Sequence, residues 1–302
     1  MSINFGRAQG LVEIRIDEQR CTVCGLCIRV CKGGPLSQEN KQIKIDQTQG
    51  IGCVACGQCV AICPQNCITV NGRDLLPEDV IPIPAKNSRT NYAQLQALLL
   101  SRRSIREYKD KPVEPEVVQQ IIDAVTTAPM GVPPSEVSML VLNSKEKVQA
   151  FTADIVQSMK KTKWMFSPAM LYLWRPIVGK EGYQIFKTFV MPLMELIIQK
   201  HDEGADWLLY NAPLAMYFYT SPASDQTDAM IAATYATIAA ESLGLGSCMI
   251  GTIAPILKQN KQLQQKYGIP RKSRHAILVI FGYPALTYKQ AIKRRLAEVK
   301  YY

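Results

Sequence analysis

Long apolar runs are missing from this sequence. No uninterrupted apolar stretch approaches the roughly 18 residues that a membrane-spanning helix needs. The opening residues, MSINFGRAQG, lack the apolar segment of a secretory signal peptide. No low-complexity tract indicates disorder, and a hydrophobic content of 47% supports an ordinary buried core. We therefore expect a folded protein with a cytoplasmic location and no membrane span.

Histidine and aromatic residues are scarce. The two histidines, His201 and His275, are not accompanied by a Ser/His/Asp catalytic set, so we expect both to be structural or surface residues. Aromatic content is 8% and no nucleic-acid-binding motif is present, so no nucleic acid partner is expected. No G-x-G-x-x-G segment follows a predicted strand, so that type of dinucleotide site is not indicated.

Positive charge is concentrated in the second part of the chain. Residues 1–80 hold eight Lys/Arg and eight Asp/Glu, so the other 27 basic and 17 acidic residues carry the whole net charge of +10. A basic domain of this kind suits an anionic cofactor or an acidic protein partner, with a plain solvated surface as the alternative.

Cysteine, in contrast, is abundant and strictly spaced. Residues 21–31 read CTVCGLCIRVC and residues 53–63 read CVACGQCVAIC, so the pattern C-x2-C-x2-C-x3-C occurs twice, 32 positions apart. Three closely spaced thiolates reach three irons of a [4Fe–4S] cube, and the fourth must come from elsewhere. In proteins with two such clusters it comes from the other block. The pattern thus predicts one cluster on Cys21, Cys24, Cys27 and Cys63 and another on Cys53, Cys56, Cys59 and Cys31.

Two zinc sites or disulfides are the alternative reading of these cysteines. Structural zinc usually uses two C-x2-C pairs separated by a longer loop, and the third cysteine of each block has no role there. Lys32 stands where the second block has Pro64, which leaves the ligands intact. Thiolate-bound clusters suit a reducing compartment, in agreement with a cytoplasmic location.

The cysteine blocks belong to a duplicated module that we place at residues 1–80. Strands are expected at 11–16 and 68–70, with a hairpin around 43–45. Cys67 lies outside both quartets and is expected to be a small buried side chain. Residues 77–92 contain three prolines and no helical period, which is typical of a linker, and we place the linker at 81–92.

A second domain is predicted over residues 93–302. Helices are expected at 94–100, from Pro115 onward, across most of 144–206 and at 228–243, with core strands at 137–142, 213–219 and 276–281. The stretch 165–182 is less regular, as in a lid over a pocket or an ordinary insertion. The helix at 228–243 is rich in alanine, which fits either a core helix or the centre of a dimer interface.

Three short segments carry the chemistry of this domain. Arg102, Arg103, Ser104 and Arg106 suit a phosphate monoester, although basic residues are common at helix ends anyway. Residues 128–135 form a stiff loop, and Gly131 allows a flat ring to approach the backbone. Residues 244–251, GLGSCMIG, are expected to form a loop between two helices whose backbone N–H groups are free to donate.

Together these segments resemble the FMN-dependent nitroreductase family. The likeness rests on Arg102 to Tyr108, Ala128 to Gly131, Leu243 to Gly251 and the basic residues 271–274, and covers residues 93 to about 285. With the cysteine module, the chain resembles ferredoxin–nitroreductase fusions. The resemblance implies an α+β fold, in which a small ferredoxin-type domain precedes a mainly antiparallel sheet flanked by helices.

The resemblance also implies how FMN is held. Arg102, Arg103 and Ser104 would bind the phosphate and ribityl chain, helped by Lys272 and Arg274, and Arg106 would lie near the pyrimidine edge. Pro129, Met130 and Gly131 would come from the partner of a homodimer with FMN at the interface. Met249, Ile250 and Gly251 would line the ring. Pro133 and Ser135, and a tail without prolines, depart from some relatives and leave the substrate open.

A two-cluster module beside FMN predicts a flavin oxidoreductase that passes electrons between clusters and flavin and reduces a small electron-poor acceptor, such as a nitroaromatic or a quinone. Either NAD(P)H, which the family binds transiently over the flavin, or a reduced ferredoxin or flavodoxin would be the donor. The alternatives are a reductive dehalogenase-like or flavin-modifying enzyme on the same fold, and a redox relay to a protein partner. A zinc-bearing binding module would be colourless.

Overall fold

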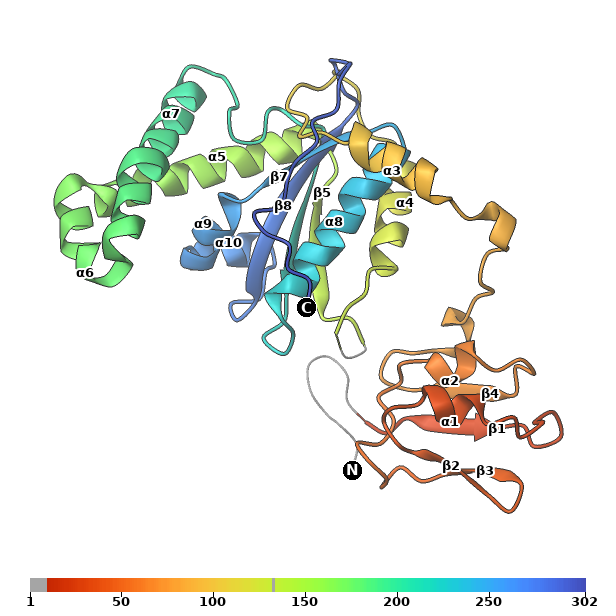
Figure 1. The fold of residues 1–302 in the computed structure, drawn as a ribbon. Coiled ribbons are helices and arrows are strands. Elements are labelled where there is room, and N and C mark those ends of the chain that lie inside the picture. The colour runs from red at the N-terminus through yellow and green to blue at the C-terminus, as the bar shows by residue number, and fades with distance from the viewer. Residues whose placement is uncertain (1–9, 132–133) are drawn as a thin grey trace. The chain divides into compact units, whose positions relative to one another are not determined.

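The computed structural model describes residues 10–131 and 134–302, so Val132 and Pro133 lie outside the described residues (Figure 1). The chain separates into two compact units. The first comprises Met1–Thr90, Pro129–Val137 and Thr220–Asp228, and the second comprises Asn91–Ala128, Ser138–Tyr219 and Ala229–Tyr302.

The first unit repeats one small motif. Strand β1 (Glu13–Ile16) pairs antiparallel with β4 (Ile68–Asn71), and β2 (Leu36–Glu39) pairs antiparallel with β3 (Gln42–Ile45). Each cysteine block runs into a one-turn helix, α1 (Leu26–Val30) or α2 (Gln58–Ala61). The strands and the hairpin predicted for this module are therefore present.

The duplication extends to the backbone of the cysteine loops. Gly25 and Gly57, 32 positions apart, begin the two short helices at φ values of 74° and 71°. Both values lie in the left-handed region, which glycine adopts without steric cost. Val23 and Ala55 are also left-handed, with φ near 53° and 54°. The two loops are thus bent in the same way, and each carries its first three cysteines around one turn.

The core of this unit is small and rich in sulfur. Among its buried residues are Val12, Ile14, Leu36, Ile68 and Val70, and Cys27, Cys59 and Cys67 are buried with them. A core of this size provides little apolar burial for a chain of this length, and such modules normally depend on metal or disulfides. The fold of this unit therefore depends on what its thiols bind.

Two short 3-10 helices, η1 (Pro77–Asp79) and η2 (Lys86–Ser88), precede the second unit, and residues 80–91 are all exposed. The second unit is built on a sheet with the strand order β5-β6-β8-β7: β5 (Val137–Leu142), β6 (Leu214–Thr220), β7 (Gly246–Ile250) and β8 (Arg274–Gly282). Strands β7 and β8 are antiparallel, with Ser247 opposite Phe281 and Ile250 opposite Leu278.

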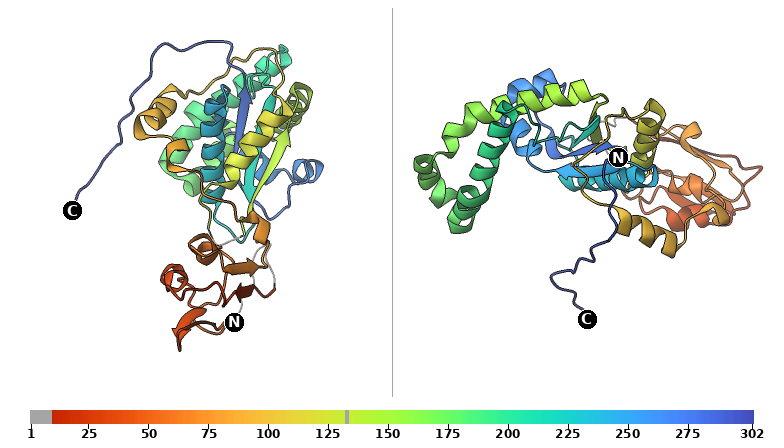
Figure 2. Two further views of the ribbon diagram at one scale, coloured as in Figure 1. Left: turned by 90° about the vertical axis from the view of Figure 1, so that its right-hand side faces the viewer. Right: turned by 90° about the horizontal axis from the view of Figure 1, so that it is seen from above.

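Helices cover both faces of this sheet, with α5 (Lys145–Thr162) on one side and α8 (Gln226–Ser242) on the other (Figure 2). On the α5 side, Phe151 and Ile155 share a core with Tyr217 and Leu278 of the central strands. The neighbouring strand residues, such as Met216 and Val279, are also fully buried. A strand buried on both faces has few polar positions, as in LAMYFYT of β6.

The remaining helices frame the sheet. They are α3 (Tyr92–Ser101), α4 (Pro115–Thr126), α9 (Ile253–Gln259) and α10 (Lys261–Lys266). The small residues of α8, including Ala232, Ala236 and Ala240, are fully buried within this chain, so α8 is a core helix. The α+β architecture with a ferredoxin-type first part, as predicted, is confirmed.

One local prediction was wrong. Residues 244–251 are not merely a loop, because Gly246–Ile250 is the edge strand β7, whose pairing with β8 provides partners that the short sequence GSCMI does not predict. The stretch 165–182 is helical but less regular, as predicted, because it comprises the end of the 3-10 helix η3 (Lys163–Phe166) and most of α6 (Pro168–Ile185), which is kinked at Gly179. A π-helical turn, η4 (Phe186–Val190), and α7 (Met191–Asp202) complete this insertion.

In the described parts of the chain, none of the helices combines the length and the apolar character that crossing a bilayer requires.

Candidate functional site

The eight paired cysteines lie around two cavities of the first unit, and each cavity takes thiols from both blocks. The first thiol cavity is lined by Cys21, Cys24, Cys27 and Cys63. The second thiol cavity is lined by Cys53, Cys56, Cys59 and Cys31. These are the two crossed quartets expected from the spacing. All ten cysteines of the chain are free thiols, so the disulfide alternative has no support.

The thiol donor set fits a cluster rather than a single ion. Within residues 10–131 and 134–302, no three His, Cys, Asp or Glu side chains gather closely enough to hold one metal ion. Each thiol cavity nevertheless has the four cysteines of one crossed quartet in its lining. Cluster ligands of this kind are thiolates. The pairing of each cysteine with an individual iron stays a prediction.

Burial favours the protonated form of three of these thiols. Burial raises the pKa of Cys27 and of Cys53, and burial together with the neighbouring Cys53 and Cys31 raises the pKa of Cys59 to about 12. Metal binding needs the deprotonated form, so loading of these cavities releases protons and is favoured by higher pH.

A ninth cysteine, Cys67, also lines the first thiol cavity. Its side chain is 5% exposed, which confirms the expected burial. Its Sγ atom lies 3.4 Å from the Sγ atom of Cys63. The sequence pattern gave no sign that this cysteine faces the same cavity as a quartet.

In the second unit, the arginine segment Arg102–Arg106 is attached to the start of β7. Ser104 forms a parallel bridge with Ser247, and the backbone N–H of Ile105 donates to the carbonyl of Ser247 at 3.0 Å. A Cβ atom at Gly246 would lie only 2.5 Å from the Ile105 side chain, so glycine is needed for this close approach. The structure thus brings together two of the three segments that were predicted to hold a flavin.

Arg106 lies close to the Tyr210 ring and to the Cys248 thiol. Its guanidinium carbon is 5.8 Å from the centroid of the Tyr210 ring. Burial raises the pKa of the Cys248 thiol, and the positive charge of Arg106 opposes that rise. Cys248 is thus a neutral buried side chain of β7 in contact with the arginine segment.

At the C-terminal end of β7 there is free space beside the backbone. Gly251 has no atom within 4 Å of the position that a Cβ would occupy. The neighbouring Thr252 has a buried hydroxyl oxygen with no hydrogen-bond partner in the structure. A flat ring that packs on the open face of Gly251, with its polar edge near Thr252, would fill the space and satisfy this hydroxyl. The residues present therefore fit an FMN-sized group.

Lys272 and Arg274 do not lie near the arginine segment. Arg274 begins β8, whereas the residue opposite Ser247 is Phe281, seven positions later on the same strand. At about 3.3 Å per residue, Arg274 is about 23 Å along the strand from the place where Ser104 meets β7. The predicted help of Lys272 and Arg274 in holding the same phosphate is therefore corrected: antiparallel pairing puts them at the opposite end.

Pro129, Met130 and Gly131 fall in the first compact unit. The N–H of Gly131 donates to the Asp228 carboxylate at 3.4 Å, and the Ser135 hydroxyl contacts the Met130 sulfur at 2.5 Å. Their predicted role, to close the flavin site of a partner subunit, stays a prediction.

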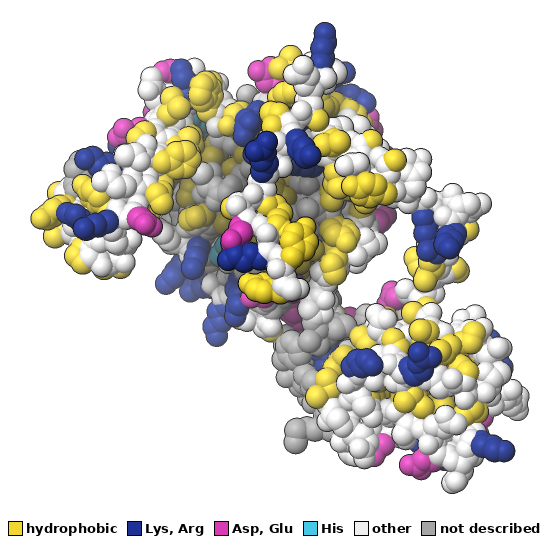
Figure 3. Space-filling view, in the orientation of Figure 1, with side chains coloured by type: hydrophobic (Ala, Val, Ile, Leu, Met, Phe, Trp, Pro, Cys, Tyr) yellow, Lys and Arg dark blue, Asp and Glu magenta, His cyan; other side chains and the backbone are white. Residues whose placement is uncertain are grey.

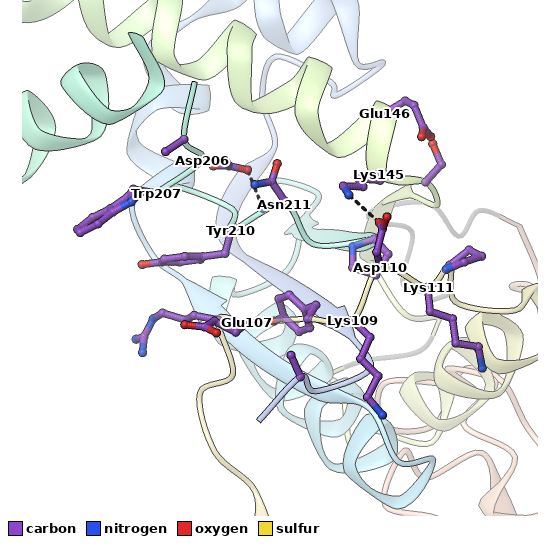
Figure 4. Close-up of a pocket in the computed structure, with 17 residues that line it drawn as sticks. Glu107, Lys109, Asp110, Lys111, Lys145, Glu146, Asp206, Trp207, Tyr210 and Asn211 are labelled. Atoms are coloured by element: carbon purple, nitrogen blue, oxygen red, sulfur yellow. Dashed lines mark hydrogen bonds and ion pairs between the residues drawn. The ribbon is translucent and has the colours of Figure 1, made fainter. Parts of the chain in front are cut away.

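Two large cavities of similar volume lie in the second unit. The charged cavity, of about 870 Å³, includes Arg106 and Tyr210 in its lining (Figure 4). Its lining holds as many basic as acidic side chains, and Lys145 and Asp110 form an ion pair across it at 2.6 Å. The carboxylate of Asp206 accepts the N–H groups of Leu208, Leu209 and Asn211. A lining of balanced charge does not favour an anion over a neutral ligand.

The apolar cavity, of about 830 Å³, lies between the insertion and the end of β7. Its lining includes Gly251 and Thr252 on one side and aromatic residues of the insertion on the other. Phe166 stacks on Phe186 with ring centroids 5.8 Å apart and meets Trp174 edge to face at 6.2 Å. Sequence reasoning left a lid over a pocket or an ordinary insertion open for this stretch, and it did not predict that aromatic residues of three elements line one cavity.

The two histidines lie on different elements of the second unit. His275 is buried on β8, with Nδ1 2.7 Å from the Tyr217 hydroxyl. Burial lowers the pKa of His275, and Lys258 adds to this effect. His201 lies on α7 and is partly exposed.

Comparison with known proteins agrees with this geometry. The Nitroreductase family model matches residues 99–283, which is more than half of the chain. The chain belongs to the nitroreductase family. A second model, the 4Fe-4S dicluster domain, matches residues 13–70, so the predicted order of a dicluster module before a nitroreductase domain is confirmed.

Individual relatives are distant. An FMN reductase [NAD(P)H] of Bacillus subtilis is 28% identical over 194 residues, which are 62% of this chain and 64% of the relative. This chain thus spans less than two thirds of the curated relative that it matches. A nitroreductase with bound FMN from Bacteroides fragilis aligns over 70% of this chain and 100% of its own with a TM-score of 0.50 and 18% identity. At that identity the likeness shows the fold.

Proposed function

We propose that this protein is an FMN-dependent oxidoreductase that passes electrons between two [4Fe–4S] clusters and FMN, and reduces a small electron-poor acceptor. The observation that carries the proposal is the crossed arrangement of the cysteine blocks around two cavities, in a chain whose other part belongs to the nitroreductase family. The clusters, when bound, exchange single electrons and FMN exchanges one or two, so the pair links one-electron carriers to two-electron chemistry.

In this proposal the cysteine quartets are the cluster ligands. Cys21, Cys24 and Cys27 with Cys63 hold one cluster, and Cys53, Cys56 and Cys59 with Cys31 hold the other. The backbone turns at Gly25 and Gly57 direct the first three thiols of each block into one cavity, and the short helix that follows carries the fourth cysteine toward the other. Residues 1–80 then form the cluster module, 81–92 a linker and 93–302 the FMN domain.

The FMN phosphate and ribityl chain are proposed to bind at Arg102, Arg103 and Ser104. A guanidinium fork pairs well with phosphate oxygens, and the bridge between Ser104 and Ser247 fixes the segment on β7. Arg106 is proposed to face the pyrimidine edge, while Met249, Ile250 and Gly251 line the ring. The tail after β8 contacts this segment, since the Tyr288 ring lies under the Arg103 guanidinium at 5.3 Å.

A homodimer with FMN at its interface is supported by apolar surface that this chain leaves uncovered. Helix α3 has no buried residue, and Tyr92, Leu99 and Leu100 are each nearly half exposed or more. After Pro284 the tail is extended, and Leu296 is 79% exposed (Figure 2). Apolar residues in such number are usually covered by a partner, and in this proposal a second copy covers them and adds Pro129–Gly131 to the site.

The apolar cavity is proposed to admit the acceptor. It reaches Gly251, where the ring is proposed to lie, and its far wall is aromatic. Flat, uncharged, electron-poor molecules such as nitroaromatics and quinones match an aromatic wall that offers stacking. The outer face of the insertion also carries exposed apolar side chains, which gather over α6 and α7 in Figure 3.

The test is an anaerobic reductive titration of the purified protein, following flavin and cluster absorbance together. Reduction of the flavin before the clusters by NADH makes FMN the entry point. Reduction of the clusters before the flavin by a reduced ferredoxin, with NADH inactive, makes the module the entry point. Turnover with a nitroaromatic or a quinone then completes the proposal.

The outcomes that contradict the proposal are equally distinct. A colourless protein without iron excludes the clusters, and a protein with iron but no flavin excludes the FMN chemistry. A third outcome is fast electron transfer to an acidic flavodoxin, at a rate that falls steeply with salt, together with negligible turnover of small acceptors. That outcome would identify the protein as a redox relay and not as an enzyme.

A further inference from the structure

The first thiol cavity holds one sulfur more than a cluster needs. Besides Cys21, Cys24, Cys27 and Cys63, its lining includes Cys67. Cys67 is buried at 5% exposure, and its Sγ is 3.4 Å from the Sγ of Cys63, which is the more exposed of the two. Two sulfurs in contact at one edge of a cavity compete for the same position on whatever the cavity binds.

The backbone holds Cys67 in that position. A turn returns the chain, with the N–H of Asn66 donating to the carbonyl of Cys63 at 3.2 Å. The carbonyl of Cys67 then accepts the N–H of Asp17, just beyond β1, at 2.8 Å. Cys67 therefore faces the cavity because its main chain is fixed on both sides, and no rearrangement of the fold is needed to reach it.

The internal duplication shows that this feature belongs to one cavity alone. With the 32-residue offset of the two blocks, the residues that follow Cys63 in the first cavity correspond to those that follow Cys31 in the second. Pro64 corresponds to Lys32, Ile68 to Leu36 and Cys67 to Pro35, and all of them line their respective cavities. Pro35 is buried like Cys67 but has no sulfur to offer. The second cavity is thus a matched control within the same molecule.

We propose that Cys67 is a reserve ligand of the first cluster, able to replace Cys63. In the exchange, the bond between iron and the Cys63 sulfur breaks and a bond to the Cys67 sulfur forms. The proton of the Cys67 thiol passes to the released Cys63 sulfur, which is in contact with it. No electron is gained or lost. The proposal rests on the cluster assignment of the proposed function, and it makes the first cluster more tolerant of damage at its exposed ligand than the second.

The test compares four anaerobically purified full-length proteins by iron and acid-labile sulfide per chain and by electron paramagnetic resonance after reduction. Cys63→Ala should retain the iron of two four-iron clusters, because Cys67 takes over. Cys63→Ala with Cys67→Ala should lose that cluster or keep it only as a three-iron species. Cys31→Ala should do the same at the second site, where Pro35 cannot help. Cys248→Ala, in the other unit, should match the wild type.

A gain-of-function variant distinguishes the loss of a cluster ligand from misfolding of the protein. Pro35→Cys in the Cys31→Ala background should restore the second cluster, because position 35 faces that cavity as position 67 faces the first. In the wild type, Cys67→Ala should shorten the lifetime of only one of the two clusters in air.

Cluster loss in Cys63→Ala as complete as in the double variant overturns the inference. A wild type without iron overturns the proposed function instead, so the two failures are told apart by the first sample measured. Unchanged cluster spectra in Cys67→Ala, combined with full loss in Cys63→Ala, would make Cys67 a buried residue without a ligand role.

Discussion

The contact between Gly246 and Ile105 joins the arginine segment to the sheet. A Cβ at position 246 would meet three Ile105 atoms at 2.5, 2.7 and 2.9 Å, which no repacking of a flexible chain end relieves. We expect Gly246→Ala to destabilise the FMN domain by about 1–3 kcal/mol through overpacking and to weaken FMN binding by displacing Ser104. Urea unfolding and FMN titration measure the two effects.

Gly251→Ala provides the contrast to that variant. No protein atom lies within 4 Å of the added methyl group, so we expect the free energy of unfolding to change by less than about 0.5 kcal/mol. FMN affinity should nevertheless fall, because the methyl group enters the space proposed for the ring. Equal loss of stability in both variants would contradict this separation of packing from binding.

His275 gives the FMN domain a pH dependence. Burial lowers its pKa in the folded state below the unfolded value of about 6.5. Since the folded state disfavours the protonated form, the unfolded state binds the proton more readily, and stability falls as the pH drops from about 7 through the folded pKa. His275→Gln should flatten this part of the curve of unfolding free energy against pH. A wild-type curve without this fall would refute the assignment, and His201→Gln is the control.

At the scale of elements, the β7–β8 register decides which cations can reach the phosphate. Arg102 lies next to the bridge between Ser104 and Ser247, whereas Arg274 lies at the far end of β8. We expect Arg102→Gln to lower FMN affinity by about 10- to 100-fold, the value of a charge-assisted hydrogen bond of about 1.5–3 kcal/mol. Arg274→Gln should leave FMN affinity within about threefold of the wild type. An equal loss of FMN affinity in Arg102→Gln and Arg274→Gln would mean that both arginines hold the same phosphate, as the sequence first suggested.

The same strand pair explains what the sequence could and could not predict. The long apolar strands β5, β6 and β8 and the amphipathic helix α4 are set by local patterns, and their positions followed from apolar runs or helical spacing. Strand β7 is not set by a local pattern, because its sequence, GSCMI, is short and begins with glycine. It becomes a strand only by pairing with β8. The wrong grouping of Lys272 and Arg274 with the arginine segment has the same origin. Without strand β7 there is no β7–β8 register, and only that register shows that these residues lie at the opposite end of β8.

The sequence pattern predicts the thiol sites, although it does not predict strand β7. The proposed ligand quartets follow from spacing alone, because a cube with four corners and a loop with three cysteines require a crossed partner. What spacing cannot show is the orientation of a cysteine outside the pattern. Cys67 faces the first thiol cavity because of a turn at Asn66 and a hydrogen bond to Asp17, and neither contact has a sequence signature.

At the scale of the whole molecule, the two units differ in what stabilises them. The first has a core of few apolar residues with cysteines among them, while the second buries a four-stranded sheet between helices. We therefore expect iron chelation or oxidation to unfold the cluster module and leave the FMN domain folded, since the binding energy of the clusters contributes to folding of the module. Cluster absorbance and FMN fluorescence, followed during heating, should give two separate transitions.

The order and coupling of these transitions complete the test. The cluster transition should move to lower temperature as the pH falls, because protons compete with iron for the buried thiols, whose pKa is raised by burial at Cys27, Cys53 and Cys59. The FMN transition should follow the separate dependence set by His275. In the variant Cys21→Ala with Cys53→Ala, the first transition should disappear while the second stays within a few degrees of its wild-type position. A single transition that both probes follow together, in the wild type and after chelation, would mean that the two units unfold as one cooperative body.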